Sequence, residues 1–147
     1  MWRRDRRSVA ATAQPDRGVV VHGGAQYAGK QGPNYTPGLS AESVGSQRLW
    51  LGSVTLPPGG RTRAHVHDGH ESGFYLVSGE NVELWTGARL EHRAVAQAGD
   101  YLYIPATVPH VAVNRSETLP AVFVGARTDP NEQESVVLLP ALGQLVP

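Results

Sequence analysis

Two histidines separated by one residue give the clearest chemical signal in the sequence. His65 and His67 flank Val66, in a stretch with strand character. Residues two apart on a β-strand point to the same face, so two imidazoles spaced in this way can converge on one ion from a rigid backbone. Glu71 follows shortly after and can supply an anionic oxygen ligand. We interpret the group as a metal-site hypothesis, against the alternative that these are ordinary histidines of a strand.

A third histidine lies far along the chain. His110 follows the segment Ile-Pro-Ala-Thr-Val-Pro (104–109) directly, and its two prolines predict a rigid turn that fixes the position of the histidine. The sequence contains no cysteine, so thiolate sites and disulfides are excluded and any metal must be held by His, Asp or Glu.

Composition narrows the class of protein. With 147 residues the chain has the length of one ordinary domain, and its 13 basic and 13 acidic residues balance to zero. Nucleic-acid and anionic-membrane surfaces need a basic excess, so neither partner is expected. No apolar run approaches the ~20 residues that cross a bilayer. Together with the absence of cysteine, this predicts a cytoplasmic protein.

The elements that would position these histidines are short strands. We expect an N-terminal arm over residues 1–17 and one domain over 18–147, with irregular or edge-strand structure up to residue 46. Thereafter turn residues such as Pro-Pro-Gly-Gly (57–60) and Ala-Gly-Asp (98–100) separate short apolar or alternating runs, which predicts an antiparallel all-β sandwich or barrel. These runs cover residues 49–56, 74–77, 82–85, 101–104, 111–113 and 121–124.

Two spaced motifs resemble those of the cupin family, and the resemblance covers residues 45–128. The first has the cupin pattern of Gly, five residues, His-x-His, three residues and Glu, here Gly59, His65, His67 and Glu71. The second has Gly, five residues, Pro, then His, three residues and Asn, here Gly99, Pro105, His110 and Asn114.

The resemblance implies a fold and a ligand set. Cupins are jelly-roll barrels, also called double-stranded β-helices, with the ligands inside. It implies one divalent transition metal (Fe, Mn, Ni, Co or Zn) bound by His65, His67, Glu71 and His110. Four protein ligands leave two open positions on an octahedral ion. The resemblance also implies a homodimer formed through an edge of the barrel.

The sequence departs from the family pattern beside Glu71. Seven residues separate Glu71 from Gly79, where the family has six, so a count back from Gly79 puts Ser72 in the Glu position. A β-bulge at Ser72-Gly73 would satisfy both counts. Without that bulge, Glu71 points away and the site consists of three histidines and water. The second motif also has Thr107 where the family usually has Gly.

Other residues are weaker catalytic candidates. Arg61 and Arg63 share the parity of His65 if the strand is unbroken, and either would then clamp a substrate carboxylate; the alternative places both in solvent at the rim. His70 is a candidate proton shuttle or an exposed loop histidine. Tyr103 is a further candidate. The expected barrel walls, about half of them facing inward, include Tyr75, Trp85, Tyr101 and Tyr103.

Three functions remain open. The favoured one is a metal-dependent enzyme acting on a small organic metabolite, as a dioxygenase because two open metal positions suit substrate and dioxygen together. The alternatives are a non-redox lyase, isomerase or cyclase, and a non-catalytic cupin that binds a small molecule. The chain has no additional DNA-binding region, which favours the enzyme, although fold does not fix function.

Overall fold

Two antiparallel β-sheets make up most of the molecule. The computed structural model describes residues 13–131, 133 and 135–147. In spatial order, the first sheet contains β1 (Tyr27–Ala28), β2 (Asn34–Leu39), β3 (Trp50–Leu56), β10 (Ala121–Arg127), β5 (Ser72–Ser78) and β8 (Tyr101–Ile104). The second contains β11 (Val136–Leu138), β4 (His65–His67), β9 (His110–Asn114), β6 (Val82–Thr86) and β7 (His92–Ala96).

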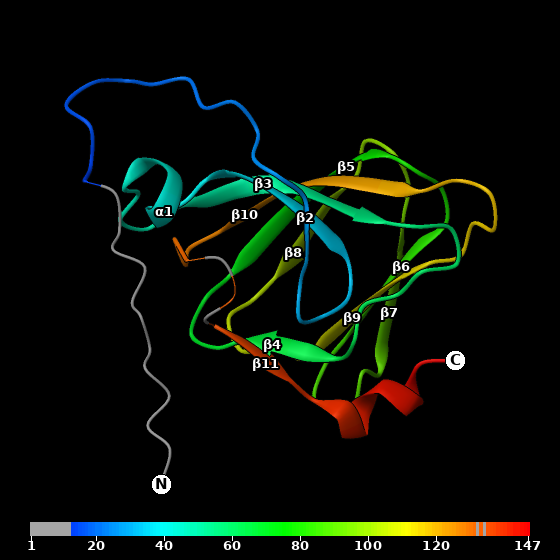
Figure 1. Ribbon diagram of the computed structural model, residues 1–147. Helices are drawn as coiled ribbons and strands as arrows, with labels where there is room; N and C mark the ends of the chain where they lie inside the picture. Colours follow the sequence, from blue (N-terminus) through cyan, green and yellow to red (C-terminus); the bar gives the residue numbers. More distant parts are fainter. Residues whose placement is uncertain (1–12, 132, 134) are drawn as a thin grey trace, which may run out of the picture.

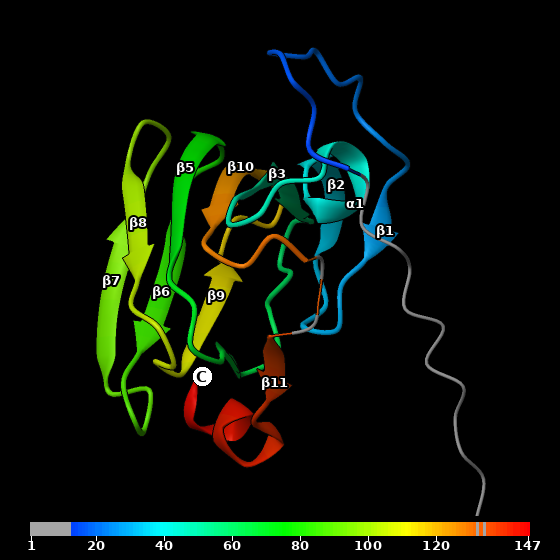
Figure 2. The same cartoon turned by 90° about the vertical axis from the view of Figure 1, so that its left-hand side faces the viewer.

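The chain passes from one sheet to the other at almost every connection after β3. Consecutive strands such as β4 and β5, or β8 and β9, therefore lie in opposite layers, and the layers enclose a common interior (Figures 1 and 2). This is a jelly-roll barrel, and the predicted all-β class is confirmed. All six apolar runs that the sequence indicates are strands.

The barrel interior is filled by alternate residues of both sheets. Leu76 and Val82, which flank the turn between β5 and β6, are completely buried, and Phe123 of β10 packs in the same cluster. Gly79 makes that turn with φ 129°, and a Cβ there would lie 3.1 Å from the Cα of Ala121. Glycine is therefore required at this position by both conformation and space.

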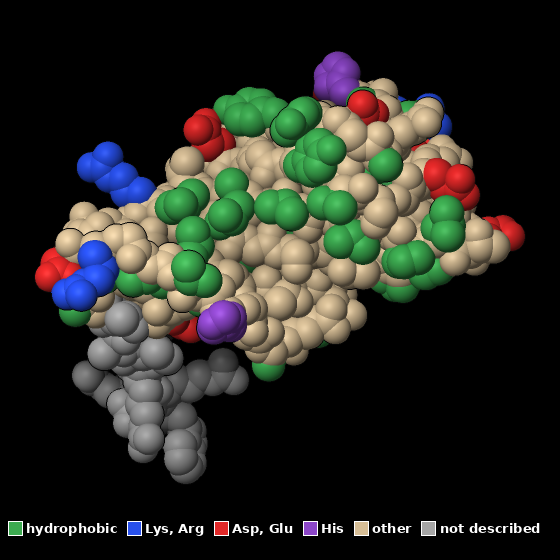
Figure 3. All heavy atoms as spheres, turned by 90° about the horizontal axis from the view of Figure 1, so that it is seen from above, with side chains coloured by type: hydrophobic (Ala, Val, Ile, Leu, Met, Phe, Trp, Pro, Cys, Tyr) green, Lys and Arg blue, Asp and Glu red, His purple; other side chains and the backbone are tan. Residues whose placement is uncertain are grey.

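The outer face of the first sheet is apolar and uncharged. No outward position of β3, β5, β8 or β10 carries a charged residue. Seen from above, hydrophobic side chains spread across the middle of the upper face while charged groups lie near its margins (Figure 3). The large exposed side chains of these strands are Tyr75, Val77, Tyr101, Tyr103 and Val124.

The outer face of the second sheet is covered by the C-terminal segment. After β11 the chain forms a 3-10 helix, η1 (Pro140–Leu145), and Val146 is then buried against Val111 and Val113 of β9. The guanidinium of Arg61 donates to the carbonyl oxygens of Val146, at 3.0 Å, and Gly143, at 2.9 Å. A second small apolar cluster thus lies outside the barrel, behind the strands that carry the histidines.

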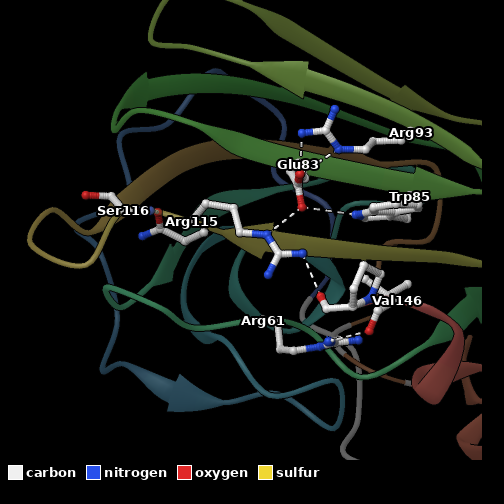
Figure 4. Close-up of polar contacts among 9 residues, drawn as sticks. Arg61, Glu83, Trp85, Arg93, Arg115, Ser116 and Val146 are labelled. Atoms are coloured by element: carbon white, nitrogen blue, oxygen red, sulfur yellow. Dashed lines mark hydrogen bonds and ion pairs between the residues drawn. The ribbon is translucent and has the colours of Figure 1, made fainter.

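A buried carboxylate stabilises this outer cluster. Glu83 of β6 is 4% exposed and pairs with Arg93 at 2.5 Å and with Arg115 at 2.6 Å (Figure 4). The indole nitrogen of Trp85 also donates to it, at 3.2 Å. Burial alone would raise the pKa of Glu83, but the hydrogen bonds from Arg115, Arg93 and Trp85 outweigh burial and lower it.

The remaining elements are small. Helix α1 (Ala41–Val44) is one turn long, and the Ser40 hydroxyl accepts a hydrogen bond from the Ser43 amide at 3.1 Å. Across the part of the chain that the structure describes, no helix has the length and apolar character needed to span a membrane. Residues 1–12 of the expected N-terminal arm lie outside the described residues.

Candidate metal centre

Three histidines meet inside the barrel. His65 and His67 come from β4, and His110 begins β9, where it pairs directly with His65. One ring nitrogen from each lies within 4.8 Å of the others, and all three residues are at most 4% exposed. The ring centroid of His65 is 4.1 Å from that of His110 and 5.1 Å from that of His67. The alternation of β4 therefore brings the His-x-His pair to the inner face, as the spacing predicts.

Backbone carbonyl groups orient two of the rings. Nδ1–H of His65 donates to the Arg63 carbonyl oxygen at 2.7 Å, and Nδ1–H of His110 donates to that of Val108 at 3.0 Å. These bonds leave Nε2 of both rings unprotonated and able to bind a cation. Nδ1 of His67 is buried and has no hydrogen-bond partner among the described residues. That orphaned nitrogen fits a metal ligand.

Burial keeps the three imidazoles neutral. It is the largest cause that lowers their pKa, to about 2 for His65, about 3 for His67 and about 4 for His110. The proximity of His110 lowers the pKa of His65 and His67 further. At pH 7 each ring therefore presents a lone pair and not a positive charge, which is the state that binds a divalent ion.

The structure does not bring Glu71 to this group. Its side chain is exposed, and its carboxylate accepts a hydrogen bond from the Tyr103 hydroxyl at 2.8 Å. The backbone of Glu71 forms two hydrogen bonds with Thr128. The Glu71 amide donates to the Thr128 hydroxyl at 3.2 Å, and the Glu71 carbonyl oxygen accepts from the Thr128 amide at 3.2 Å. Glu71 thus lies at the edge of β5, facing solvent.

Ser72 occupies the inward position instead. The register of β5 against β10 shifts between Leu76 and Ser78, so the extra residue of the first motif is accommodated at Val77 and not at Ser72-Gly73. Ser72 is 2% exposed, and its hydroxyl has no partner among the described residues. Because the expected bulge lies elsewhere, the interior receives a neutral hydroxyl where the family pattern has a carboxylate.

The three histidines face an otherwise apolar pocket. It has an empty volume of about 460 Å³, including its open part. Apart from the histidines, only Tyr35 and Thr62 contribute polar side chains to the wall, and no Lys or Arg of the described residues lines it. The apolar wall comprises Pro33, Val54, Leu56, Phe74, Leu84, Leu102, Ile104, Ala112 and Phe123.

The two candidate arginines point away from this pocket. The chain bends at Ala64, which breaks the alternation, so that Thr62 faces the interior while Arg61 and Arg63 are exposed. Arg61 holds the C-terminal segment, and Arg63 donates to the Lys30 carbonyl oxygen at 3.0 Å. The unbroken strand needed for a carboxylate clamp is absent here.

The aromatic residues expected in the barrel walls also lie outside. Tyr75, Tyr101 and Tyr103 are 38%, 82% and 61% exposed on the outer face of the first sheet. Trp85 packs in the outer cluster beneath the C-terminal segment. The expectation that about half of these residues face inward is wrong, because the inward positions of β8 are Leu102 and Ile104.

His70 lies near the site but outside the group. Its Nδ1 is 3.5 Å from the Thr128 hydroxyl, and its proximity contributes to the lowered pKa of His67. Tyr35 and Thr62, which the sequence did not single out, do line the pocket. No periodic signal marks the segment around Tyr35, and Thr62 follows the turn before β4 without a motif of its own.

The donor set fits a divalent ion. Three neutral imidazoles suit Zn, Fe, Co or Ni, and they leave coordination positions for water or a ligand. Imidazole donors alone do not discriminate among these metals.

Comparison with known proteins agrees with this architecture. Residues 52–126 match the family model described as the cupin domain. A search of curated proteins found no match.

Solved structures share the fold. An oxalate decarboxylase from Lactobacillus farciminis in complex with formate has a TM-score of 0.65 and 20% identity, covering 78% of this chain but 33% of its own. An oxalate oxidase in complex with the substrate analogue glycolate has a TM-score of 0.62 and 23% sequence identity. The match covers 78% of this chain and 60% of the oxidase chain. An uncharacterized protein with a double-stranded β-helix domain from Klebsiella pneumoniae has a TM-score of 0.60 and 19% sequence identity. The match covers 78% of this chain and 84% of the Klebsiella chain. The chain thus spans less than two thirds of the oxalate enzymes, and at these identities the likeness concerns the fold.

Proposed function

The chain belongs to the cupin domain family, and from this premise we propose that it is a metal-dependent enzyme that acts on a small organic molecule. One observation carries the proposal: three buried, neutral imidazoles from two paired strands face a single pocket. His65, His67 and His110 would hold one divalent ion. When bound, that ion would supply Lewis-acid activation of a substrate oxygen or, if it is redox-active, activation of dioxygen.

The protein would bind the ion without a carboxylate. With Ser72 at the inward position of β5 and Glu71 in solvent, the donor set carries no charge. A divalent ion would therefore keep its full charge and attract an anionic or strongly dipolar oxygen ligand. The low-dielectric wall of the pocket strengthens that attraction.

The pocket would select a small and mostly apolar substrate. Its apolar wall would exclude water and contact the apolar surface of a substrate, and it has few polar groups that could bind a charged one. Oxalate, on which the two named enzymes act, carries two carboxylates. No Lys or Arg is among the described residues of the pocket wall, and the buried Arg127, which is close enough to lower the pKa of His65 and His67, lies behind that wall over the Trp50 ring. The few polar groups of the wall argue for a substrate with fewer charges than oxalate.

Within the enzyme class we favour a dioxygenase, because substrate and dioxygen can share the open positions beside three histidines. A non-redox lyase, isomerase or cyclase is the second candidate, since three histidines are also the ligands of a catalytic zinc ion. Binding of a small molecule without turnover is the third.

Metal content and oxygen uptake separate these functions. Protein purified without chelators should carry about one equivalent of transition metal per chain, which His110→Ala should lose and His92→Ala should retain, because His92 lies on exposed β7 outside the group. Oxygen uptake with small enolisable or aromatic compounds would support the dioxygenase. Full occupancy by zinc alone would favour the non-redox enzyme, and tight ligand binding without turnover would favour the binding protein. Absence of metal from all preparations would contradict the proposal.

We further propose that the protein acts as a homodimer. The apolar outer face of β3, β5, β8 and β10 supports this, and the Glu71 carboxylate beside it is bound to the Tyr103 hydroxyl. Its five large exposed side chains offer roughly 500 Å² of apolar surface, a substantial part of the about 800 Å² that each partner buries in a stable complex. This interface would use the face of the sheet and not, as the resemblance implied, an edge of the barrel.

A further inference from the structure

A buried tyrosine in the wall of the metal pocket is paired with a buried glutamine outside that wall. Tyr35 of β2 lines the pocket and is 5% exposed, and Gln31, in the turn between β1 and β2, is 1% exposed. Nε2 of Gln31 donates a hydrogen bond to the Tyr35 hydroxyl oxygen. Oε1 of Gln31 is buried with no partner among the described residues. Polar atoms buried in this way are costly unless something completes their hydrogen bonds.

The pair is connected to the metal centre through the backbone. The carbonyl oxygen of Gln31 accepts from the Arg63 amide at 2.6 Å, and the carbonyl oxygen of Arg63 accepts from Nδ1–H of His65 at 2.7 Å. Arg63 also donates from its guanidinium to the Lys30 carbonyl oxygen. The turn that carries Gln31 is therefore fixed relative to His65, which gives Tyr35 a defined position in the same pocket.

The Tyr35 hydroxyl has a hydrogen to donate. Its oxygen accepts from Gln31, and no acceptor for its own hydrogen is found among the described residues. Burial raises the pKa of Tyr35 well above its ordinary value, so the hydroxyl stays protonated at neutral pH. The hydroxyl of Thr62, the other polar side chain of the wall besides the histidines, likewise accepts a hydrogen bond, from the Ala112 amide at 2.9 Å.

We propose that Tyr35, positioned by Gln31, is a hydrogen-bonding subsite for the ligand of the metal pocket, and that this ligand is a small, largely apolar molecule with at least one oxygen acceptor. The inference rests on the proposed function, since the same ligand would reach the metal held by the three histidines. Tyr35 would donate to the ligand oxygen, and Gln31 would hold the hydroxyl in the orientation for donation. No proton is transferred.

A purely structural role makes a different prediction. Tyr35 stacks on Tyr27 with ring centroids 5.6 Å apart and contacts the edge of Trp50 at 6.1 Å. If packing were its whole contribution, Tyr35→Phe would preserve ligand binding, because phenylalanine keeps the ring. The proposed subsite requires the hydroxyl itself.

The test uses the full chain loaded with Co(II), whose visible absorption reports ligands that enter its coordination sphere. Acetohydroxamate is the probe, a molecule of five heavy atoms that binds metals through oxygen. Tyr35→Phe should weaken its binding about tenfold, the usual cost of leaving a buried polar atom without its partner. Tyr75→Phe is the matched control, because Tyr75 lies on the outer face, and it should bind like the wild type.

Gln31→Met provides a second variant that keeps the length of the side chain but removes the positioning hydrogen bond. It should weaken the probe several-fold while Co(II) affinity and the unfolding midpoint stay close to those of the wild type. If Co(II) binds but acetohydroxamate binds equally to the wild type and Tyr35→Phe, or binds to neither, the subsite is refuted and the metal centre stands. If Co(II) does not bind to the wild type, the proposed function fails and this inference fails with it.

Discussion

His65 and His110 are directly paired across β4 and β9, with their ring centroids 4.1 Å apart, although 44 residues separate them in the sequence. The same backbone pairing that joins the two strands therefore brings two imidazoles together. His67 joins them because the alternation of β4 points it to the same face. The three proposed ligands are thus positioned by strands and not by loops, which favours a preorganised site.

Glu71 should be dispensable for metal binding. Its carboxylate is bound to the Tyr103 hydroxyl in solvent, so Glu71→Gln should leave the affinity for Co(II) or Zn(II) within about twofold of the wild type. A competition titration against a chromophoric chelator measures this. A loss of 100-fold or more would restore Glu71 as a ligand and contradict the neutral donor set.

The metal-free protein should lose stability as the pH falls below neutrality. The folded-state pKa of each site histidine, about 4 or lower, lies below the value near 6.5 of the unfolded chain. Between these values the unfolded state binds more protons, so the stability present above pH 6.5 decreases as the pH drops toward 4. The expected loss between pH 7 and pH 5 is up to about 2 kcal/mol for each histidine.

Urea unfolding of chelator-treated protein at the two pH values provides the measurement. The triple variant His65→Asn, His67→Asn, His110→Asn is the control, and it should show a much smaller pH dependence. Equal stability of the wild type at pH 7 and pH 5 would show that the histidines are not held neutral.

Glu83→Gln should destabilise the protein without affecting metal binding. The substitution leaves Arg93 and Arg115 without their shared carboxylate on the outer face of β6, which costs about 1–2 kcal/mol because both arginines remain partly exposed to water. Chemical denaturation measures the change, with Glu117→Gln as an exposed control. Unchanged stability would mean that the cluster beneath the C-terminal segment contributes little to the fold.

Tyr101→Glu should convert the proposed dimer to a monomer. Tyr101 is 82% exposed on β8, the edge strand of the proposed dimer face, and a carboxylate there would be buried in an apolar interface without a partner. Light scattering coupled to size exclusion gives the mass. Leu119→Glu, at an exposed position in the loop between β9 and β10, is the control and should leave the mass unchanged. A wild-type monomer at all concentrations tested would contradict the homodimer.

The sequence predicts the barrel well because its strands are bounded by strong turn residues. The structure has turns at two segments that the sequence marks with proline or glycine, Pro57-Pro58-Gly59-Gly60 and Ala98-Gly99-Asp100. The segment before residue 46 is harder, because β2 contains Pro37 and Gly38 and shows no alternation. The contribution of Tyr35 to the pocket, and of Gln31 behind it, therefore has no local signal.

The ligand set shows what spacing alone cannot determine. One extra residue in the first motif must be accommodated somewhere in β5, and sequence does not indicate whether this occurs at Ser72-Gly73 or at Val77. The position decides whether Glu71 or Ser72 faces inward. A bend at Ala64 has a similar effect on Arg61 and Arg63, because one break in alternation reverses the face to which every preceding residue points.

The central claim is that His65, His67 and His110 hold a single ion without a carboxylate. Anomalous diffraction at the absorption edge of the metal, from crystals of the loaded protein, tests it most directly. The predicted result is one peak per chain, about 2.0–2.2 Å from one nitrogen of each of the three histidines, with Ser72 nearby and Glu71 still bound to Tyr103. A peak bound by the Glu71 carboxylate, or none among the three rings in a fully loaded crystal, would contradict it.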